Sequence, residues 1–159
     1  MLAAAAIAAG VGIAVWAGAR AGDSGRASAD PAVFLRGIVS RLADNDYAGA
    51  WPSLHPAQQR VATRAAYVEC EQLTPVPGHL DWIRPAGTKD ARIRVAGDGA
   101  VAGKAVTFTL KLSEPVSRQS MRRTVTAYAV TVDGRWRWVL PPKRFGVYLA
   151  KACPAAPAA

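Results

Sequence analysis

Few side chains in this chain have the types and spacing needed for acid–base chemistry, and they are scattered along it. The candidates are two histidines, two tyrosines and one aspartate: His55, His79, Tyr47, Tyr128 and Asp81. His55 precedes Pro56 at an expected helix break, which favours a surface or capping role. The two tyrosines are typical of core aromatic positions, whereas Asp81 could act as a buried base. A general base also needs a partner within reach and a shifted pKa, and the spacing indicates neither, so we predict no catalytic residue.

Metal and phosphate chemistry find little support in the sequence. Two histidines and two cysteines occur without the spacing of metal ligands. The segment Gly97-Asp98-Gly99 lacks the Lys-Ser/Thr that follows a phosphate-binding loop, and it is expected to be a hairpin turn. We therefore expect neither a metal nor a cofactor.

The two cysteines, Cys70 and Cys153, are expected to form a disulfide. Both lie beyond the apolar N-terminal segment, and a pair of cysteines in an exported domain meets an oxidising environment. The bridge would hold the segment after the last strand against the last helix before the sheet. The alternative is two unpaired thiols.

Positive charge is concentrated in the second half of the chain, which has a formal net charge of +9 overall. Five basic residues alternate with expected core positions and are predicted to form one basic face: Arg92, Arg94, Lys111, Arg135 and Arg137. Such a face is either simply solvated or attracted to anionic lipid or phosphate-bearing wall polymers. Few aromatic residues are left to stack on bases, so a nucleic-acid partner is not expected.

The first segment contains an uncharged, alanine-rich run over residues 2–19. Its length fits a marginal transmembrane helix, and its small residues also fit a cleaved secretory signal. A buried core helix is a third alternative. We expect a signal or anchor at 1–21, a linker at 22–29, a folded domain at 30–153 and a disordered tail at 154–159. The domain is then extracytoplasmic, either anchored in the cytoplasmic membrane or secreted.

Helices are predicted in the first part of the folded domain. Asp30-Pro31 is a capping residue followed by a proline at the first helical position. Apolar residues follow at helical spacing: Phe34, Leu35, Ile38, Val39 and Leu42. Shorter helical pieces are expected over residues 47–54, 56–60 and 64–71, the last capped by Thr63.

Strands are predicted in the second part. Alternating or β-rich segments occupy residues 80–84, 91–96, 104–112, 124–132 and 135–140, and residues 145–151 form a helical or extended return. Helices followed by antiparallel strands indicate an α+β fold.

The last two strands meet at Asp133-Gly134, a strong hairpin signal. A two-residue turn places Ala129 opposite Trp138, whereas a three-residue loop with a bulge places Tyr128 opposite Trp138. The second register collects large side chains on one face: Tyr128, Val130, Trp136, Trp138 and Leu140. Arg135 and Arg137 then point outward. We predict the bulged register because it separates apolar from polar residues more cleanly.

The order of elements resembles a known family. The helix PAVFLRGIVSRLADNDYAGAW, the acidic break, the short helices and the final DGRWRW strand are similar to the cone-shaped family named after nuclear transport factor two. The resemblance implies N-terminal helices packed on a strongly curved antiparallel sheet, with a cavity at the open end. It suggests four cavity candidates: Tyr47, Trp51, Asp81 and Tyr128. The final strand also resembles the small domain that precedes some cell-wall transpeptidases, although no Ser-x-x-Lys motif is present.

These observations favour a non-enzymatic extracytoplasmic domain that binds a small apolar ligand or a cell-envelope partner. One alternative is an isomerase- or dehydratase-like enzyme using the cone cavity. Another is a structural accessory of a membrane complex, with a homodimer through the sheet as one arrangement. A close Asp–His or Asp–Tyr pair lining the cavity would favour the enzyme, and a filled cone would favour the accessory.

Overall fold

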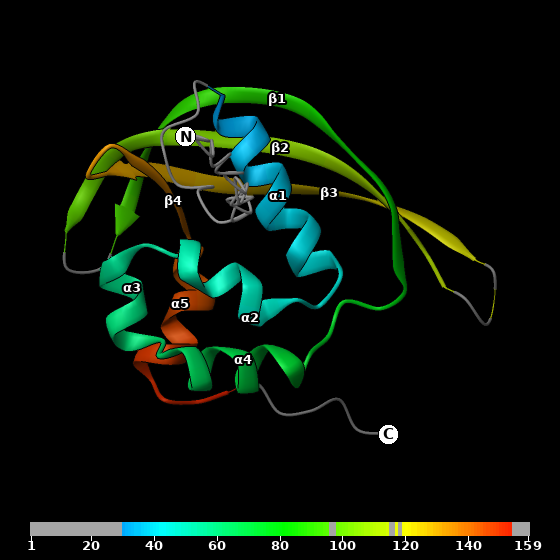
Figure 1. Cartoon of the computed structure of the whole chain (residues 1–159), viewed down its shortest axis with the longest axis horizontal. Helices are drawn as coiled ribbons and strands as arrows, with labels where there is room; N and C mark the ends of the chain where they lie inside the picture. The colour runs from blue at the N-terminus through cyan, green and yellow to red at the C-terminus, as the bar shows by residue number, and fades with distance from the viewer. Residues whose placement is uncertain (1–29, 96–97, 115–116, 118, 154–159) are drawn as a thin grey trace, which may run out of the picture.

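The computed structural model describes residues 30–95, 98–114, 117 and 119–153. Within these ranges helices come first, four antiparallel strands follow, and a further helix comes last, which confirms the α+β class (Figure 1). The expected N-terminal hydrophobic helix, the linker and the tail lie outside the described residues. Among the described helices, none has the length and apolar character to cross a membrane.

Helix α1, Pro31–Ala43, forms where the sequence predicts it. The Asp30 side chain caps it by accepting a hydrogen bond from the backbone N–H of Ala32 at 2.8 Å. Its apolar stripe is buried against the sheet, and Figure 1 shows the helix beneath the long strands. Burial of this stripe ties the first element of the fold to all four strands of the sheet.

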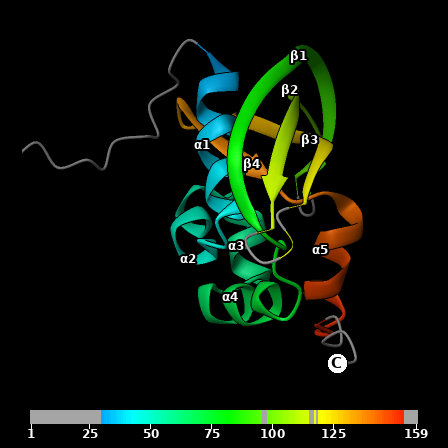
Figure 2. The same cartoon turned by 90° about the vertical axis from the view of Figure 1, so that its right-hand side faces the viewer.

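Four short elements follow α1. They are α2 (Tyr47–Ala50), the 3₁₀ turn η1 (Trp51–Ser53), α3 (Pro56–Val61) and α4 (Arg64–Gln72). The side chains of Asp46, His55 and Thr63 accept hydrogen bonds from the first turns of α2, α3 and α4. Figures 1 and 2 show α2, α3 and α4 grouped with the last helix below α1 and the strands.

The sheet is a meander in the order β1-β2-β3-β4. The strands are β1 (His79–Val95), β2 (Gly99–Ser113), β3 (Ser120–Val132) and β4 (Arg135–Val139). Strand β1 joins two segments that the sequence predicts as separate strands. It passes Pro85 and Gly87 through a register shift, which an edge strand tolerates because one side needs no ladder. The three long strands arch over α1 in Figure 1.

The predicted register of the last hairpin is wrong. Ala129 lies opposite Trp138, so the turn has two residues and no bulge. Asp133 and Gly134 have φ values of 50° and 70°. Positive φ at both central residues is the geometry of a type I′ turn, whose twist matches that of the flanking strands. Local turn chemistry therefore decided the register.

The sequence predicts the bulged register because that register separates apolar from polar residues, but both faces of this part of the sheet bury apolar residues. Trp138 lies on the face that packs against α1, together with Phe108 and Leu110, which we call the helix face. Tyr128 and Val130 belong to the opposite face. There they join a second cluster of buried residues: Ala57, Ile93, Val95 and Val139. Trp138 and Tyr128 thus contribute to two different cores.

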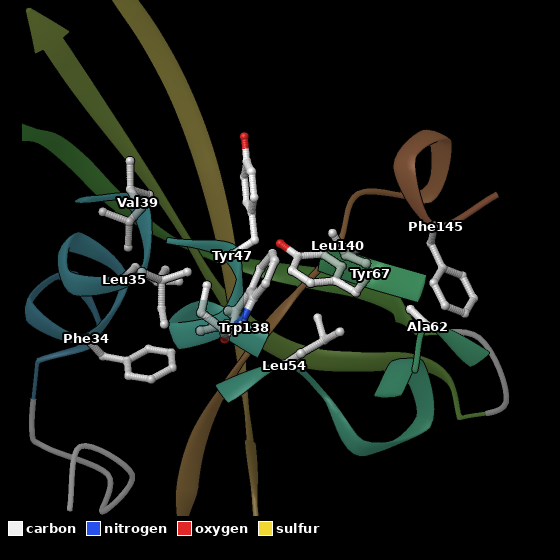
Figure 3. Close-up of a cluster of buried hydrophobic side chains, with 14 of the residues drawn as sticks. Phe34, Leu35, Val39, Tyr47, Leu54, Ala62, Tyr67, Trp138, Leu140 and Phe145 are labelled. Atoms are coloured by element: carbon white, nitrogen blue, oxygen red, sulfur yellow. Dashed lines mark hydrogen bonds between the residues drawn. The ribbon is translucent and has the colours of Figure 1, made fainter. Parts of the chain in front are cut away.

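The larger core converges on Trp138 and Tyr67, as Figure 3 shows. The ring centroids of these two residues are 6.3 Å apart in an edge-on arrangement. The indole N–H of Trp138 donates to the backbone oxygen of Ala50 at 3.0 Å. Trp136 shares the face of Trp138 but is half-buried, whereas Leu140 is buried beside Trp138 as expected.

Helix α5, Pro142–Leu149, returns the chain to α4. The predicted disulfide is confirmed: Cys70 and Cys153 are bridged across a sequence separation of 83, with Cα atoms 5.0 Å apart. Beside the bridge, the guanidinium of Arg144 donates to Glu71, with Nε 2.8 Å from Oε1. The hydroxyl of Tyr148 donates to the same carboxylate. The return segment is therefore fixed to α4 by a covalent bond and an ion pair.

Candidate functional site

An apolar pocket lies between α1 and the helix face of the sheet. Its volume is about 270 Å³. The lining comes from the C-terminal half of α1, from β2 and β3, and from the segment that ends the sheet: Ile38, Val39, Leu42, Ala43, Val76, Leu110, Leu112, Arg123, Val125, Thr126, Ala127, Trp138, Val139 and Pro141. A mostly apolar hollow of this size suits a small hydrophobic ligand.

The pocket exists because β4 is much shorter than β3. The last pair between them is Tyr128 with Val139, so the part of β3 over residues 120–127 has no described partner strand on that side. Pro141 and Pro142 then turn the chain into α5 instead of continuing the ladder. Among the described residues, the edge of β3 over this stretch therefore has no neighbouring strand, and side chains on its helix face line the hollow beside α1.

Arg123 is the charged residue among the side chains that line the pocket. It is exposed, and its Nε donates to the sulfur of Met121 at 3.2 Å. Within the described part of the chain it forms no ion pair with an acidic side chain. The described lining contains no carboxylate, imidazole or phenol, so it offers no general base.

The four cavity candidates from the sequence do not line this pocket. Tyr47 is buried in the larger core, and its hydroxyl donates to Asn45 Oδ1 at 2.6 Å. Burial raises the pKa of Tyr47. The indole N–H of Trp51 donates to the backbone oxygen of Ala62 at 2.8 Å. Both residues are thus fixed by structural contacts.

The other two candidates lie in different places again. Tyr128 lines a separate hollow together with Arg92 and Arg94. Asp81 lies at the sheet surface, where its carboxylate accepts from the Ser113 hydroxyl at 2.6 Å and lies 3.0 Å from the Lys111 ammonium. These two bonds hold the pKa of Asp81 below its usual range. The structure does not bring the four candidates together.

Several of the pocket-lining residues are ones that the sequence predicts only as core. Ile38 and Val39 belong to the apolar stripe of α1, and Leu110 and Leu112 belong to the alternating pattern of β2. An apolar residue gives the same signal whether it faces another side chain or a hollow. The lengths of β3 and β4 were the missing information.

Among the described residues, the imidazole of His55 lies close to the carboxylate of Asp98. His55 Nε2 lies 3.6 Å from Asp98 Oδ2, and Nδ1 accepts the backbone N–H of Ala57 at 3.2 Å. Burial lowers the pKa of His55, and Asp98 opposes that shift. The lone pair of the neutral ring is already used to cap α3, so this histidine has a capping role and is not free to take a proton from a substrate.

A buried polar cluster surrounds Glu71, away from the pocket. Burial raises the pKa of Tyr67 and of Tyr148, and the hydrogen bond to Glu71 adds to the shift for Tyr148. The hydrogen bond to Glu71 also raises the pKa of Arg144. The Glu71 side chain is 12% exposed. Arg144 and Tyr148 both donate to the Glu71 carboxylate, which is the pattern of a structural ion pair joining α4 to α5.

The predicted basic face is wrong as a single surface. Arg92 and Arg94 pair with Ala102 and Ala100, which alternate onto the helix face of β2. The remaining three residues, Lys111, Arg135 and Arg137, alternate onto the opposite face, which we call the outer face. Strand register, which the sequence did not reveal, separates the two sets.

Arg137 is also less available than expected. It is half-buried, and its Nη1 donates to the backbone oxygen of Pro52 at 2.8 Å. Arg135, by contrast, is exposed as predicted. The side chain of Arg137 therefore joins β4 to η1.

No family model and no curated protein matches the chain. Among the described residues, no group of three or more His, Cys, Asp or Glu side chains is placed to hold a metal ion. The apolar pocket therefore has to be interpreted from its own geometry.

Proposed function

We propose that the protein is a non-enzymatic extracytoplasmic domain that binds a small apolar ligand in the pocket between α1 and the sheet. The observation that carries the proposal is the lining of that pocket, which is apolar apart from Arg123 and the edge residue Thr126. Apolar ligands are held by such hollows because binding removes hydrocarbon surface from water.

Two further features support the rest of the proposal. The disulfide between Cys70 and Cys153 fits an oxidising compartment outside the cytoplasm. The uncharged run at residues 2–19 fits an anchor or a secretory signal. The resemblance to the family named after nuclear transport factor two adds a cone-like fold with a cavity, and the arching sheet over α1 is compatible with it (Figure 1).

Filling the pocket is expected to weaken ligand binding strongly. Ala127 lies on the helix face of β3, in the lining, and a phenyl ring in its place would occupy the hollow. We expect Ala127→Phe to weaken binding of 1-decanol at least tenfold, measured by NMR titration of the pocket methyl groups.

Ala102→Phe is the matched control, since Ala102 is exposed on the same face of the sheet but outside the pocket. It should bind 1-decanol like the unchanged protein. Equal binding by both variants, or shifts outside the lining residues, would refute the pocket as the site.

A second candidate function is attachment to an anionic membrane through the outer face. Trp82 carries two guanidinium groups over its ring, with Arg84 at 4.9 Å and Arg122 at 5.7 Å from the centroid. Trp82 pairs with Lys111, which pairs with Arg122, so these charges share one strip. Asp81 offsets one of them. The strip would attract anionic headgroups in a salt-dependent way.

We expect Arg84→Gln/Arg122→Gln to weaken co-sedimentation with vesicles of anionic phospholipid. The matched control is Arg92→Gln/Arg94→Gln, which removes the same charge from the helix face. Each basic residue near an anionic surface contributes about 1 kcal/mol, so the first variant should bind about tenfold or more weakly. Equal loss in both variants would indicate attraction to net charge alone, and binding that ignores salt would exclude an electrostatic mechanism.

A further inference from the structure

Arg123 gives the apolar pocket one positively charged wall. It projects from the helix face of β3, two residues from Val125, where the strand has no described partner beyond it. Within the described residues, its side chain donates to the sulfur of Met121, which is a weak acceptor. A guanidinium carries five donors, so most of its hydrogen-bonding capacity remains for a ligand.

Comparison with the neighbouring Arg122 shows that Arg123 alone of the two faces the pocket. Arg122 alternates onto the outer face and lies over Trp82, whereas Arg123 lines the pocket on the helix face. The two residues have the same charge and adjacent positions, but their side chains lie on opposite faces of the sheet. The positive charge at the pocket is therefore a property of one side chain.

We propose, in an inference that rests on the proposed function, that the ligand is a single-chain amphiphile with an anionic head group. Its hydrocarbon chain lies among the side chains of α1 and β2, and its head group pairs with Arg123. Planar guanidinium groups bind carboxylates and phosphates through paired, charge-assisted hydrogen bonds. A neutral or cationic head group would leave this charge without a partner.

The pocket volume sets the scale of a suitable probe. Its volume of about 270 Å³ lies near the lower end of the range for small-molecule pockets. This corresponds to a medium-length chain. Decanoate and decyl phosphate are therefore suitable probes, and 1-decanol and decyltrimethylammonium are their neutral and cationic counterparts.

The test is NMR titration of the full chain with these four compounds, each below the concentration at which it forms micelles. We expect the two anions to bind more tightly than 1-decanol, and the cation to bind most weakly. Arg123→Gln should weaken binding of the anions about three- to tenfold, since the side chain is exposed, and should leave 1-decanol unchanged. Arg123→Lys should retain part of the preference because the charge remains.

Arg122→Gln is the control, and it should bind all four compounds like the unchanged protein. Tighter binding of decyl phosphate than of decanoate would indicate a phosphate head group, and the reverse order a fatty acid. Equal affinity for anions and 1-decanol, or equal loss in Arg122→Gln and Arg123→Gln, would overturn the role of Arg123 while leaving the apolar pocket intact. Absence of binding by all four compounds would instead refute the proposed function.

Discussion

Replacing Trp138 by alanine is expected to lower the free energy of unfolding by about 3 to 5 kcal/mol. The side chain is 4% exposed and lies in the larger core. Its loss would leave a cavity beside Tyr67 and an unpaired backbone oxygen at Ala50. The backbone of Trp138 accepts the N–H of His55 at 2.9 Å, so the same position also joins β4 to the start of α3.

Urea denaturation of the variant and of the unchanged protein measures this loss. Trp138→Phe separates the two contributions, because it keeps most of the packing and removes the hydrogen bond to Ala50. It should cost about 1 to 3 kcal/mol. Trp82→Ala, on the outer face, is the control for removal of an indole and should cost less. A midpoint for Trp138→Ala close to that of the unchanged protein would contradict the burial of this residue.

The sequence predicts the elements of the fold well because their signals are local. Asp30-Pro31, Thr63 and the apolar stripe of α1 define helices by capping and periodicity, and each occurs in the structure. Asp133-Gly134 likewise marks a hairpin. In each case the residues that give the signal are also the ones that make the contact.

Register and strand length were harder to predict because they depend on distant contacts. The bulged register of the last hairpin assumed one buried face, but Tyr128 packs with Ile93 on one face while Trp138 packs under α1 on the other. The expected basic face failed for the same reason. Arg92 and Arg137 each alternate with apolar neighbours, yet their strands bury opposite faces at those points.

The candidate site depends on the difference in length between β3 and β4. The pocket opens where β4 ends and β3 continues, and no residue type marks that difference in length. Pro141 and Pro142 mark the end of β4 in the sequence, but the start of β3 lies in a polar segment without a strong strand signal. Arg123 could be recognised as important only once the side of the sheet it faces was known.

Removing the disulfide is expected to lower the free energy of unfolding by about 4 to 5 kcal/mol in the chain-entropy model. The bridge closes a long loop, with a sequence separation of 83. Breaking it increases the freedom of the unfolded chain, so the loss applies even though α5 keeps its other contacts with α4. Cys70→Ala/Cys153→Ala is the appropriate variant, since Cys70 is buried and a methyl group fits that site without an unpaired hydroxyl.

Denaturation midpoints with and without dithiothreitol provide the internal control. The reductant should destabilise the unchanged protein to the level of the double variant and leave the double variant unaffected. Phe145 remains buried, and Arg144 remains paired with Glu71. The variant should therefore still fold, with faster hydrogen exchange in α5 than in α1. Two free thiols in the unfolded, unreduced protein would contradict the bridge, and with it the argument that the domain matures outside the cytoplasm.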